Sequence, residues 1–147
     1  MPVKVQSDAF DPVAELAGFA AGRTDIGAVV TFSGLVRDDS GGQLREMVIE
    51  HYPGMTERAI TTIGQEAAQR WTLGDWLVIH RHGPLAPGET IMMVATAARH
   101  RADAFAAAEF LMDYLKSRAP FWKKEITDTG AGWVEARAQD EAALKRW

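Results

Sequence analysis

The chain has 147 residues, of which 47% are hydrophobic and 24% charged, the composition of an ordinary globular protein rather than a disordered one. Its net charge of −4, from 16 Lys and Arg against 20 Asp and Glu, argues against a general nucleic-acid binder, which usually carries a basic excess. The sequence contains no cysteine, which excludes disulfides, thiolate metal sites and cysteine nucleophiles; any sulfur chemistry therefore needs sulfur from another molecule.

The length fits one domain, which we expect to span residues 1–147. The opening residues lack the apolar core of a signal peptide. No apolar run approaches the roughly 18 residues that a membrane helix needs. We therefore expect a cytoplasmic protein with no membrane contact.

Hydrophobic periodicity and turn residues predict the elements of the N-terminal half. Asp11-Pro12 is typical of a helix start, and the helix is expected to run to about Ala21. The β-branched stretch 27–36 predicts a strand, and 44–52 predicts a second strand paired with the first across a polar, flexible loop at 38–42.

The C-terminal half continues the mixture of helices and strands. In chain order we expect a helix at 53–71, strands at 76–82 and 90–97 joined by a hairpin-like loop, a helix at 102–117, strands at 121–127 and 133–136, and a short helix in the tail. Pro120 ends the long helix, because the residue before proline disfavours helical geometry. The order lacks strict βαβ repetition, so it predicts an α+β domain with antiparallel pairing.

Two groups of cations are the main candidates for chemistry. The first basic cluster is Arg99-His100-Arg101, where a strand passes into a helix; cations oppose the helix dipole there, which favours an anion site over a chance arrangement. The second basic cluster surrounds Phe121-Trp122 and consists of Lys116, Arg118, Lys123 and Lys124. Both clusters together suggest one anionic site.

The strand period places Lys123 and Lys124 on opposite faces, so only one of them can share a pocket with Lys116. Periodicity alone leaves open which one it is. A lysine desolvated beside other cations has a depressed pKa and can act as acid, base or nucleophile. Arg37, at the end of a strand next to the polar loop, is a candidate ligand clamp, and Arg137 is a weaker candidate of the same kind.

The histidines raise the question of a metal. His80 and His82 share one strand face and His51 ends another strand, but no zinc-ligand spacing is present, and we predict no metal and no cofactor. The tryptophans at 71, 76, 133 and 147 are expected in the core or at an interface.

Six segments together resemble the family of large, catalytic subunits of molybdopterin synthase, the MoaE family. They are GAVVTFSGLVRD (27–38), EHYPGMTE (50–57), IHRHGPLAPGE (79–89), HRADAF (100–105), MDYLKSRAPFWKKE (112–125) and WVEAR (133–137). The resemblance implies an α/β hammerhead fold with additional antiparallel β-strands. It also implies transfer of sulfur from the thiocarboxylated Gly-Gly C-terminus of a small ubiquitin-like carrier subunit to cyclic pyranopterin monophosphate, which makes the molybdopterin dithiolene of molybdenum cofactor biosynthesis.

The family's partners and site residues are carried over by position. The resemblance implies a homodimer within a heterotetramer, with sites at the dimer interface, so that His100 and Arg101 serve the neighbouring copy. It implies catalysis by Lys116 and Lys123, which selects the Lys123 face of the strand. Substrate contacts fall on Arg37, His100, Arg101, Lys124 and Glu125, and the wider set of candidates adds Phe32, Leu35, Val36, Met112 and Arg137. Some members carry a basic residue where this chain has Leu35.

Two other interpretations stay open on the residues alone. A Schiff-base lysine lyase acting on a small phosphorylated substrate would also use Lys116 among other cations. A non-catalytic module would use Phe121-Trp122 as a docking surface for a protein partner.

Overall fold

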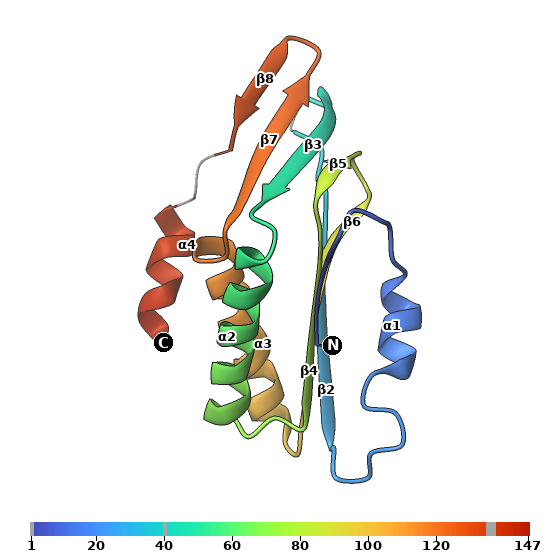
Figure 1. Cartoon of the computed structure of the whole chain (residues 1–147), viewed down its shortest axis with the longest axis vertical. Helices are drawn as coiled ribbons and strands as arrows, with labels where there is room; N and C mark the ends of the chain where they lie inside the picture. Colours follow the sequence, from blue (N-terminus) through green and yellow to red (C-terminus); the bar gives the residue numbers. More distant parts are fainter. Residues whose placement is uncertain (1, 40, 135–137) are drawn as a thin grey trace.

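The computed structural model describes residues 2–39, 41–134 and 138–147, which form two four-stranded sheets and the helices around them (Figure 1). The order of strands is β1-β4-β6-β2 in the first sheet and β5-β3-β7-β8 in the second. The strands are β1 (Val3–Gln6), β2 (Ala28–Leu35), β3 (Leu44–His51), β4 (Asp75–Arg81), β5 (Gly83–Leu85), β6 (Thr90–Ala98), β7 (Phe121–Thr127) and β8 (Gly130–Trp133). The helices are α1 (Pro12–Gly18), α2 (Met55–Arg70), α3 (Arg101–Ser117), α4 (Ala138–Ala143) and the 3-10 turn η1 (Leu144–Arg146).

The two central strands of the first sheet, β4 and β6, are buried on both faces, and the alternation of side chains along β4 shows how. Trp76 and Val78 point towards α2 and α3 and join the main core with Phe110. Leu77 and Ile79 point the other way, into a smaller cluster with Phe10 and Phe19 beside α1. The strands of this sheet lie between α1 on one side and α2 with α3 on the other (Figure 1). Strands covered in this way are apolar at consecutive positions.

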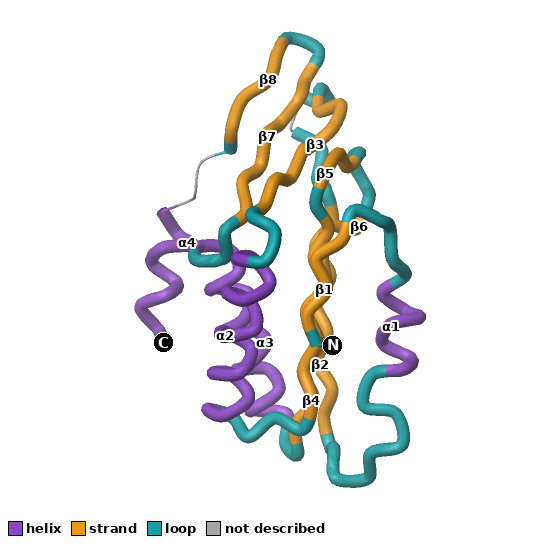
Figure 2. The backbone as a smooth tube through the Cα atoms, in the orientation of Figure 1, coloured by secondary structure: helices purple, strands orange, loops and turns teal. Residues whose placement is uncertain are grey.

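The second sheet lies beyond one end of the first and is more exposed (Figure 2). Ile49 on β3 and Lys123 on β7 are directly opposite each other, so they share one face. Ile49 is buried in the main core, and this face therefore turns towards the helices. Trp122 and Lys124 lie on the opposite face, where the ring of Trp122 is exposed.

Thr56 fixes the junction between the helices and β7. The Thr56 hydroxyl donates to the carbonyl oxygen of Pro120 at 3.2 Å and accepts from the amide of Tyr52 at 3.1 Å. Thr56 is fully buried, so these two hydrogen bonds are shielded from water. The start of β7 is thus tied to the end of β3 and the first turn of α2.

The α+β prediction is confirmed, but one strand pairing was wrong. The strand at 44–51 pairs with β5 and β7 in the second sheet, whereas β2 pairs with β6 in the first. A short polar loop favours a hairpin, but the apolar residues of β2 belong to the first sheet and those of β3 to the second. The predicted pairing of β4 with β6 is confirmed, while β1 and β5 were not predicted.

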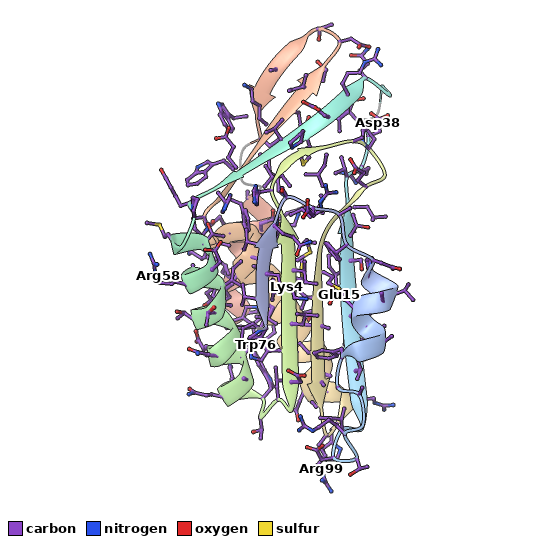
Figure 3. The ribbon with its side chains drawn as sticks, turned by 45° about the vertical axis from the view of Figure 1, so that its right-hand side comes forward. Lys4, Glu15, Asp38, Arg58, Trp76 and Arg99 are labelled. Carbon is purple, nitrogen blue, oxygen red and sulfur yellow. The ribbon has the colours of Figure 1, made fainter. Side chains whose placement is uncertain are left out.

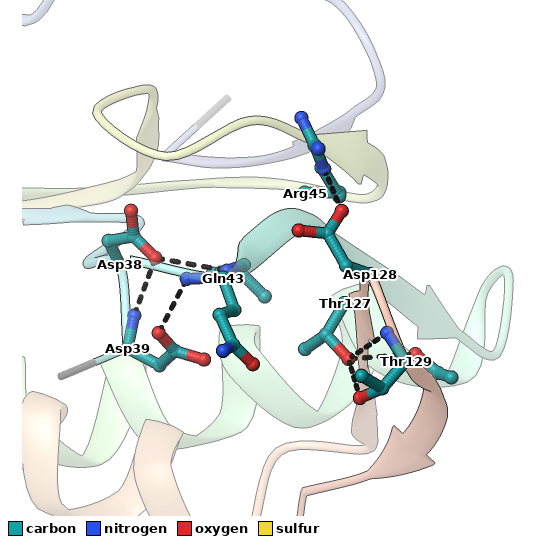
Figure 4. Close-up of polar contacts among 9 residues, drawn as sticks. Asp38, Asp39, Gln43, Arg45, Thr127, Asp128 and Thr129 are labelled. Carbon is teal, nitrogen blue, oxygen red and sulfur yellow. Dashed lines mark hydrogen bonds and ion pairs between the residues drawn. The ribbon is translucent and has the colours of Figure 1, made fainter. Parts of the chain in front are cut away.

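In the loop after β2, which was predicted to be polar and flexible, the described residues make side-chain hydrogen bonds to the backbone. The Asp38 carboxylate accepts from the amides of Asp39 and Leu44, and the Asp39 carboxylate accepts from those of Gly41 and Gln43 (Figure 4). Side-chain acceptors of this kind satisfy backbone donors in tight turns. An ion pair between Arg45 and Asp128 joins the nearby end of β3 to the β7–β8 turn (Figure 4).

Candidate functional site

The candidate site forms where α3 ends and β7 begins. Lys116 lies in the last turn of α3, Pro120 ends the connection, and Phe121 opens β7. Lys123 follows two positions later on the same face as Phe121. The chain between the two lysines is short, and the Thr56–Pro120 hydrogen bond holds its turn.

Lys116 and Lys123 are close enough to interact electrostatically. The pKa of Lys123 is lowered from its ordinary 10.5 to about 8, first because the amine is buried and then because Lys116 adds a second positive charge. Asp140 of α4 partly opposes this shift. The Lys116 side chain is exposed, whereas Lys123 is partly buried. One exposed cation therefore lies beside an amine that releases its proton at a pH nearer neutrality.

Histidines and an aromatic ring form the inner wall of the site. The imidazole of His80, at the end of β4, stacks on Phe121 with ring centroids 3.7 Å apart and an angle of 17° between the rings. His51 lies directly opposite Phe121 on β3, and its ring is 4.1 Å from that of His82.

The pKa of His80 records this environment. The pKa is lowered from 6.5 to about 3, first by burial and then by the positive charges of Lys123 and Lys116, against a hydrogen bond to the carbonyl of Arg81 that raises it. The imidazole is therefore neutral at physiological pH. The wall behind the two lysines is polar but carries no charge from His80.

Lys124 lies on the other face of β7, as the strand period predicts. Its amine is 5.6 Å from the centre of the Trp133 ring, directly across the β7–β8 pair. Of the four tryptophans expected in the core or at an interface, Trp71, Trp76 and Trp147 pack in the main core, whereas Trp133 is 55% exposed. Glu125 returns to the Lys123 face, two positions nearer the hairpin.

The first basic cluster lies at the far end of α3. His100 is the N-cap of the helix and Lys116 is in its last turn, so they are about 24 Å apart along the axis at 1.5 Å per residue. Figure 3 shows Arg99 at one end of the molecule and Asp38, the neighbour of Arg37, at the other. The interpretation that both basic clusters form one site within a single chain is therefore wrong.

The remaining predicted residues divide between core and surface. Arg37 and Val36 follow β2 at the lysine end of the first sheet; Arg37 is exposed, while Val36 is buried and exchanges backbone hydrogen bonds with Gly88 and Glu89. Phe32 and Leu35 are exposed on β2, an edge strand. Met112 is partly buried one turn before Lys116 on α3, and Arg137 lies outside the described residues.

Two hollows in the structure do not include the lysines. They have volumes of about 660 and 490 Å³, lie between α3 and α4 and along the β7–β8 hairpin, and neither is lined by Lys116 or Lys123. Within residues 2–39, 41–134 and 138–147, no group of three or more His, Asp or Glu side chains is arranged to hold a metal ion. No helix in that part of the chain is long and apolar enough to cross a membrane.

Comparison with known proteins identifies the family. The family model described as "MoaE protein" matches residues 5–118. The molybdopterin synthase catalytic subunit of Cereibacter sphaeroides is 68% identical over 147 residues, covering 100% of both chains. The solved structure of a molybdopterin biosynthesis MoaE protein from Burkholderia ambifaria is 52% identical with a TM-score of 0.84, covering 99% of this chain and 96% of that chain. The crystal structure of molybdopterin synthase from Staphylococcus aureus has 29% identity and a TM-score of 0.83, covering 92% of this chain and 98% of that chain.

These relatives indicate an enzyme subunit of the transferase type in molybdenum cofactor biosynthesis. The chain belongs to the MoaE family. The resemblance is thereby confirmed, and the lyase and docking-module alternatives receive no support. The roles of individual residues stay predictions.

No functional role was predicted for His80 from the sequence. Its position two residues from His82 on one strand raised only the question of a metal. The stacking on Phe121 joins two separate sheets, so no local pattern reports it.

Proposed function

We propose that this chain transfers sulfur from the thiocarboxylated C-terminus of a small ubiquitin-like carrier subunit to cyclic pyranopterin monophosphate, forming the dithiolene of molybdopterin. The observation that supports this most directly is the amine of Lys123, partly buried beside Lys116 at the junction of α3 and β7. The names of the relatives, which are catalytic subunits, support an assembly with another subunit.

The two lysines have different environments and therefore different proposed roles. Lys116 is exposed, and its charge would stabilise the oxyanion that develops on the thiocarboxylate group. Lys123 has a pKa of about 8, so it would exchange a proton with the reacting pterin during sulfur transfer. Each role would lower the barrier by roughly 2–4 kcal/mol, the range for oxyanion donors in other enzymes.

The exposed Lys116 side chain is compatible with entry of a partner's extended C-terminal tail. Trp122, on the outer face of β7, packs edge to face with the exposed ring of Tyr52 with centroids 4.6 Å apart, and Met55 is exposed at the start of α2. Exposed apolar groups of this kind are typical of protein interfaces. We propose that the body of the carrier contacts this surface while its Gly-Gly tail reaches the lysines.

A homodimer is also proposed. Val29, Phe32 and Leu35 are 45%, 44% and 57% exposed on β2, an edge strand that offers both apolar surface and backbone hydrogen-bonding groups. His100 and Arg101 are too far from Lys116 to serve the lysines of their own copy. In a dimer they would bind the substrate phosphate at the partner's site, with Arg37, Lys124 and Glu125 as further contacts. A cytoplasmic location goes with this proposal.

Reconstitution tests the activity. The purified chain is mixed with thiocarboxylated carrier and cyclic pyranopterin monophosphate, and dithiolene product is measured against a mixture whose carrier ends in an ordinary carboxylate. Product should form only with the thiocarboxylated carrier. Borohydride trapping of a covalent substrate adduct on the chain, without any carrier, would instead indicate Schiff-base chemistry.

Mixed dimers test the shared site. Lys123→Ala copies, inactive alone, and Arg101→Ala copies, about tenfold weaker at precursor concentrations well below KM, are allowed to exchange subunits and are assayed at those concentrations. If Arg101 serves the partner's lysines, each mixed dimer contains one intact site, and random exchange restores about a quarter of wild-type activity. If Arg101 serves its own copy, both sites of the mixed dimer stay defective and activity does not recover.

A further inference from the structure

His80 is a buried polar residue to which the proposed chemistry gives no role. It is 5% exposed and continues the row of Trp76 and Val78, the β4 side chains that face α2 and α3. At its position the helix layer ends and β7 begins, so the imidazole faces Phe121 of the second sheet instead of a helix. A buried polar ring at the junction of two sheets requires a reason beyond packing.

The hydrogen bond of His80 fixes its tautomer. Nδ1 lies 2.8 Å from the carbonyl oxygen of Arg81, and a carbonyl can only accept, so Nδ1 carries the hydrogen. The ring is neutral because burial and the surrounding positive charges lower its pKa to about 3. Nε2 therefore has a lone pair and no proton.

Three titratable groups act on His80 from three different elements. They are Lys123 from β7, Lys116 from α3 and His51 from β3. Phe121 and Lys123 alternate on one face of β7, and His80 stacks on Phe121, so the imidazole lies on the lysine face of the strand. A carboxylate at this position would hold Lys123 in its charged form, and a cation would repel it.

We propose that His80 is a positioning residue for Lys123: its neutral imidazole braces Phe121 and gives the lysine amine a polar, uncharged neighbour inside the protein. The inference rests on the proposed role of Lys123 in sulfur transfer. In this proposal, the dipole of the His80 imidazole reduces the free-energy cost of burying the charged Lys123 amine. The two groups form no ion pair. Packing alone would need only an aromatic ring at this position.

Two substitutions separate these roles. His80→Phe keeps the ring that stacks on Phe121 but removes the lone pair and the donor to Arg81. His80→Gln keeps a neutral polar group and loses the ring. If the polar neighbour matters, His80→Phe lowers kcat about tenfold with the KM for the pterin precursor unchanged, and His80→Gln recovers most of the rate. If only packing matters, the order of the two variants reverses, and this would overturn the proposal.

The decisive readout is the titration of the Lys123 amine, followed by NMR of lysine labelled at Cε and assigned with Lys123→Met. His80→Phe should lower the midpoint by roughly half a pH unit or more, because the amine loses its polar neighbour. An unchanged midpoint would overturn the proposal. The titration needs neither carrier nor precursor, so it tests His80 separately from the sulfur-transfer activity.

His82→Phe is the matched control. His82 contacts His51, and its pKa is lowered first by burial and then by His51, against Glu57, without a contribution from either lysine. The Lys123 midpoint should stay at its wild-type value in this variant. If His80→Phe does not fold, the reciprocal experiment decides: Lys123→Met must raise the titration midpoint of the His80 imidazole, and an unmoved midpoint would reject the coupling.

Discussion

The two ends of α3 both carry clustered cations, but they place them in different surroundings. At the N-terminal end, Arg99, His100 and Arg101 are exposed. At the C-terminal end, Lys116 lies near Lys123, whose amine is partly buried on the face of β7 where His80 stacks on Phe121. Sequence clusters of the same charge can therefore serve separate tasks. The exposed end suits binding of an anion, and the enclosed end suits movement of protons.

Removal of either lysine at the enclosed end should have the largest effect. We expect Lys116→Ala and Lys123→Ala each to lower kcat by about 100-fold or more, because each removes a group that acts in the transition state. The measurement is dithiolene formation from thiocarboxylated carrier and precursor. Lys4→Ala, which removes only a surface ion pair with Glu15, is the control and should retain the wild-type rate. Near wild-type rates in both site variants would reject the assignment.

Because the Lys123 amine is buried, its protonated form should lower the free energy of unfolding. Its pKa is about 8 in the folded chain and near 10.5 when unfolded, so the unfolded state binds more protons between these values and stability rises with pH across that window. Lys123→Met should therefore raise the free energy of unfolding by up to about 3 kcal/mol at pH 7. The gain should disappear above about pH 10.5. Urea unfolding at pH 7 and at pH 10.5 checks this, and an equal gain at both values would contradict the shifted pKa.

Substitution of Thr56 tests how far the lysine site at the C-terminal end of α3 depends on the hydrogen bonds that hold the start of β7. Thr56→Val keeps the shape of the side chain but leaves the buried amide of Tyr52 and the carbonyl of Pro120 without their partner. We expect a loss of roughly 1–3 kcal/mol in the free energy of unfolding and a fall in kcat, because the start of β7 is no longer fixed. Thr62→Val, at an exposed site where the hydroxyl bonds only within α2, is the matched control. If Thr56→Val and Thr62→Val lose the same stability and the same kcat, the Thr56 hydrogen bonds do not support the site.

The smallest expected effect belongs to the exposed end. His100→Ala and Arg101→Ala should raise the KM for the pterin precursor about tenfold, because each removes one charge-assisted contact to phosphate. The KM for the carrier should stay unchanged, as should the titration of Lys123. Steady-state kinetics with each substrate varied in turn measures both constants. Equal weakening of carrier and precursor would count against a phosphate site.

Helices and strands were predicted well because their signals are local. The α3 helix was predicted from 102 to 117 and runs from Arg101 to Ser117, and β7 was predicted with the bounds it has. The pairing of β3 was wrong because a short loop does not determine which sheet a strand enters. The four-residue β1 was not predicted, since it gains its order from parallel pairing with β4.

The candidate site was predicted in part. Alternation along β7 correctly separates Lys123 from Lys124, although the choice between them needed the family resemblance. The length of the predicted helix already implied that His100 and Lys116 lie far apart, yet the similarity of charge favoured a single site. The contact of His80 with Phe121 could not be predicted, because it depends on how the two sheets meet.

The tandem lysines on β7 also affect how the strand tolerates a shift of register. Loss of one residue between Pro120 and Lys123 would move Lys123 to the outer face and bring Lys124 to the inner position, because side chains alternate with a period of two. An ammonium group would still be delivered next to Lys116. Deletion of one residue at this point should therefore be less damaging than replacement of both lysines, a form of redundancy that is built into the strand.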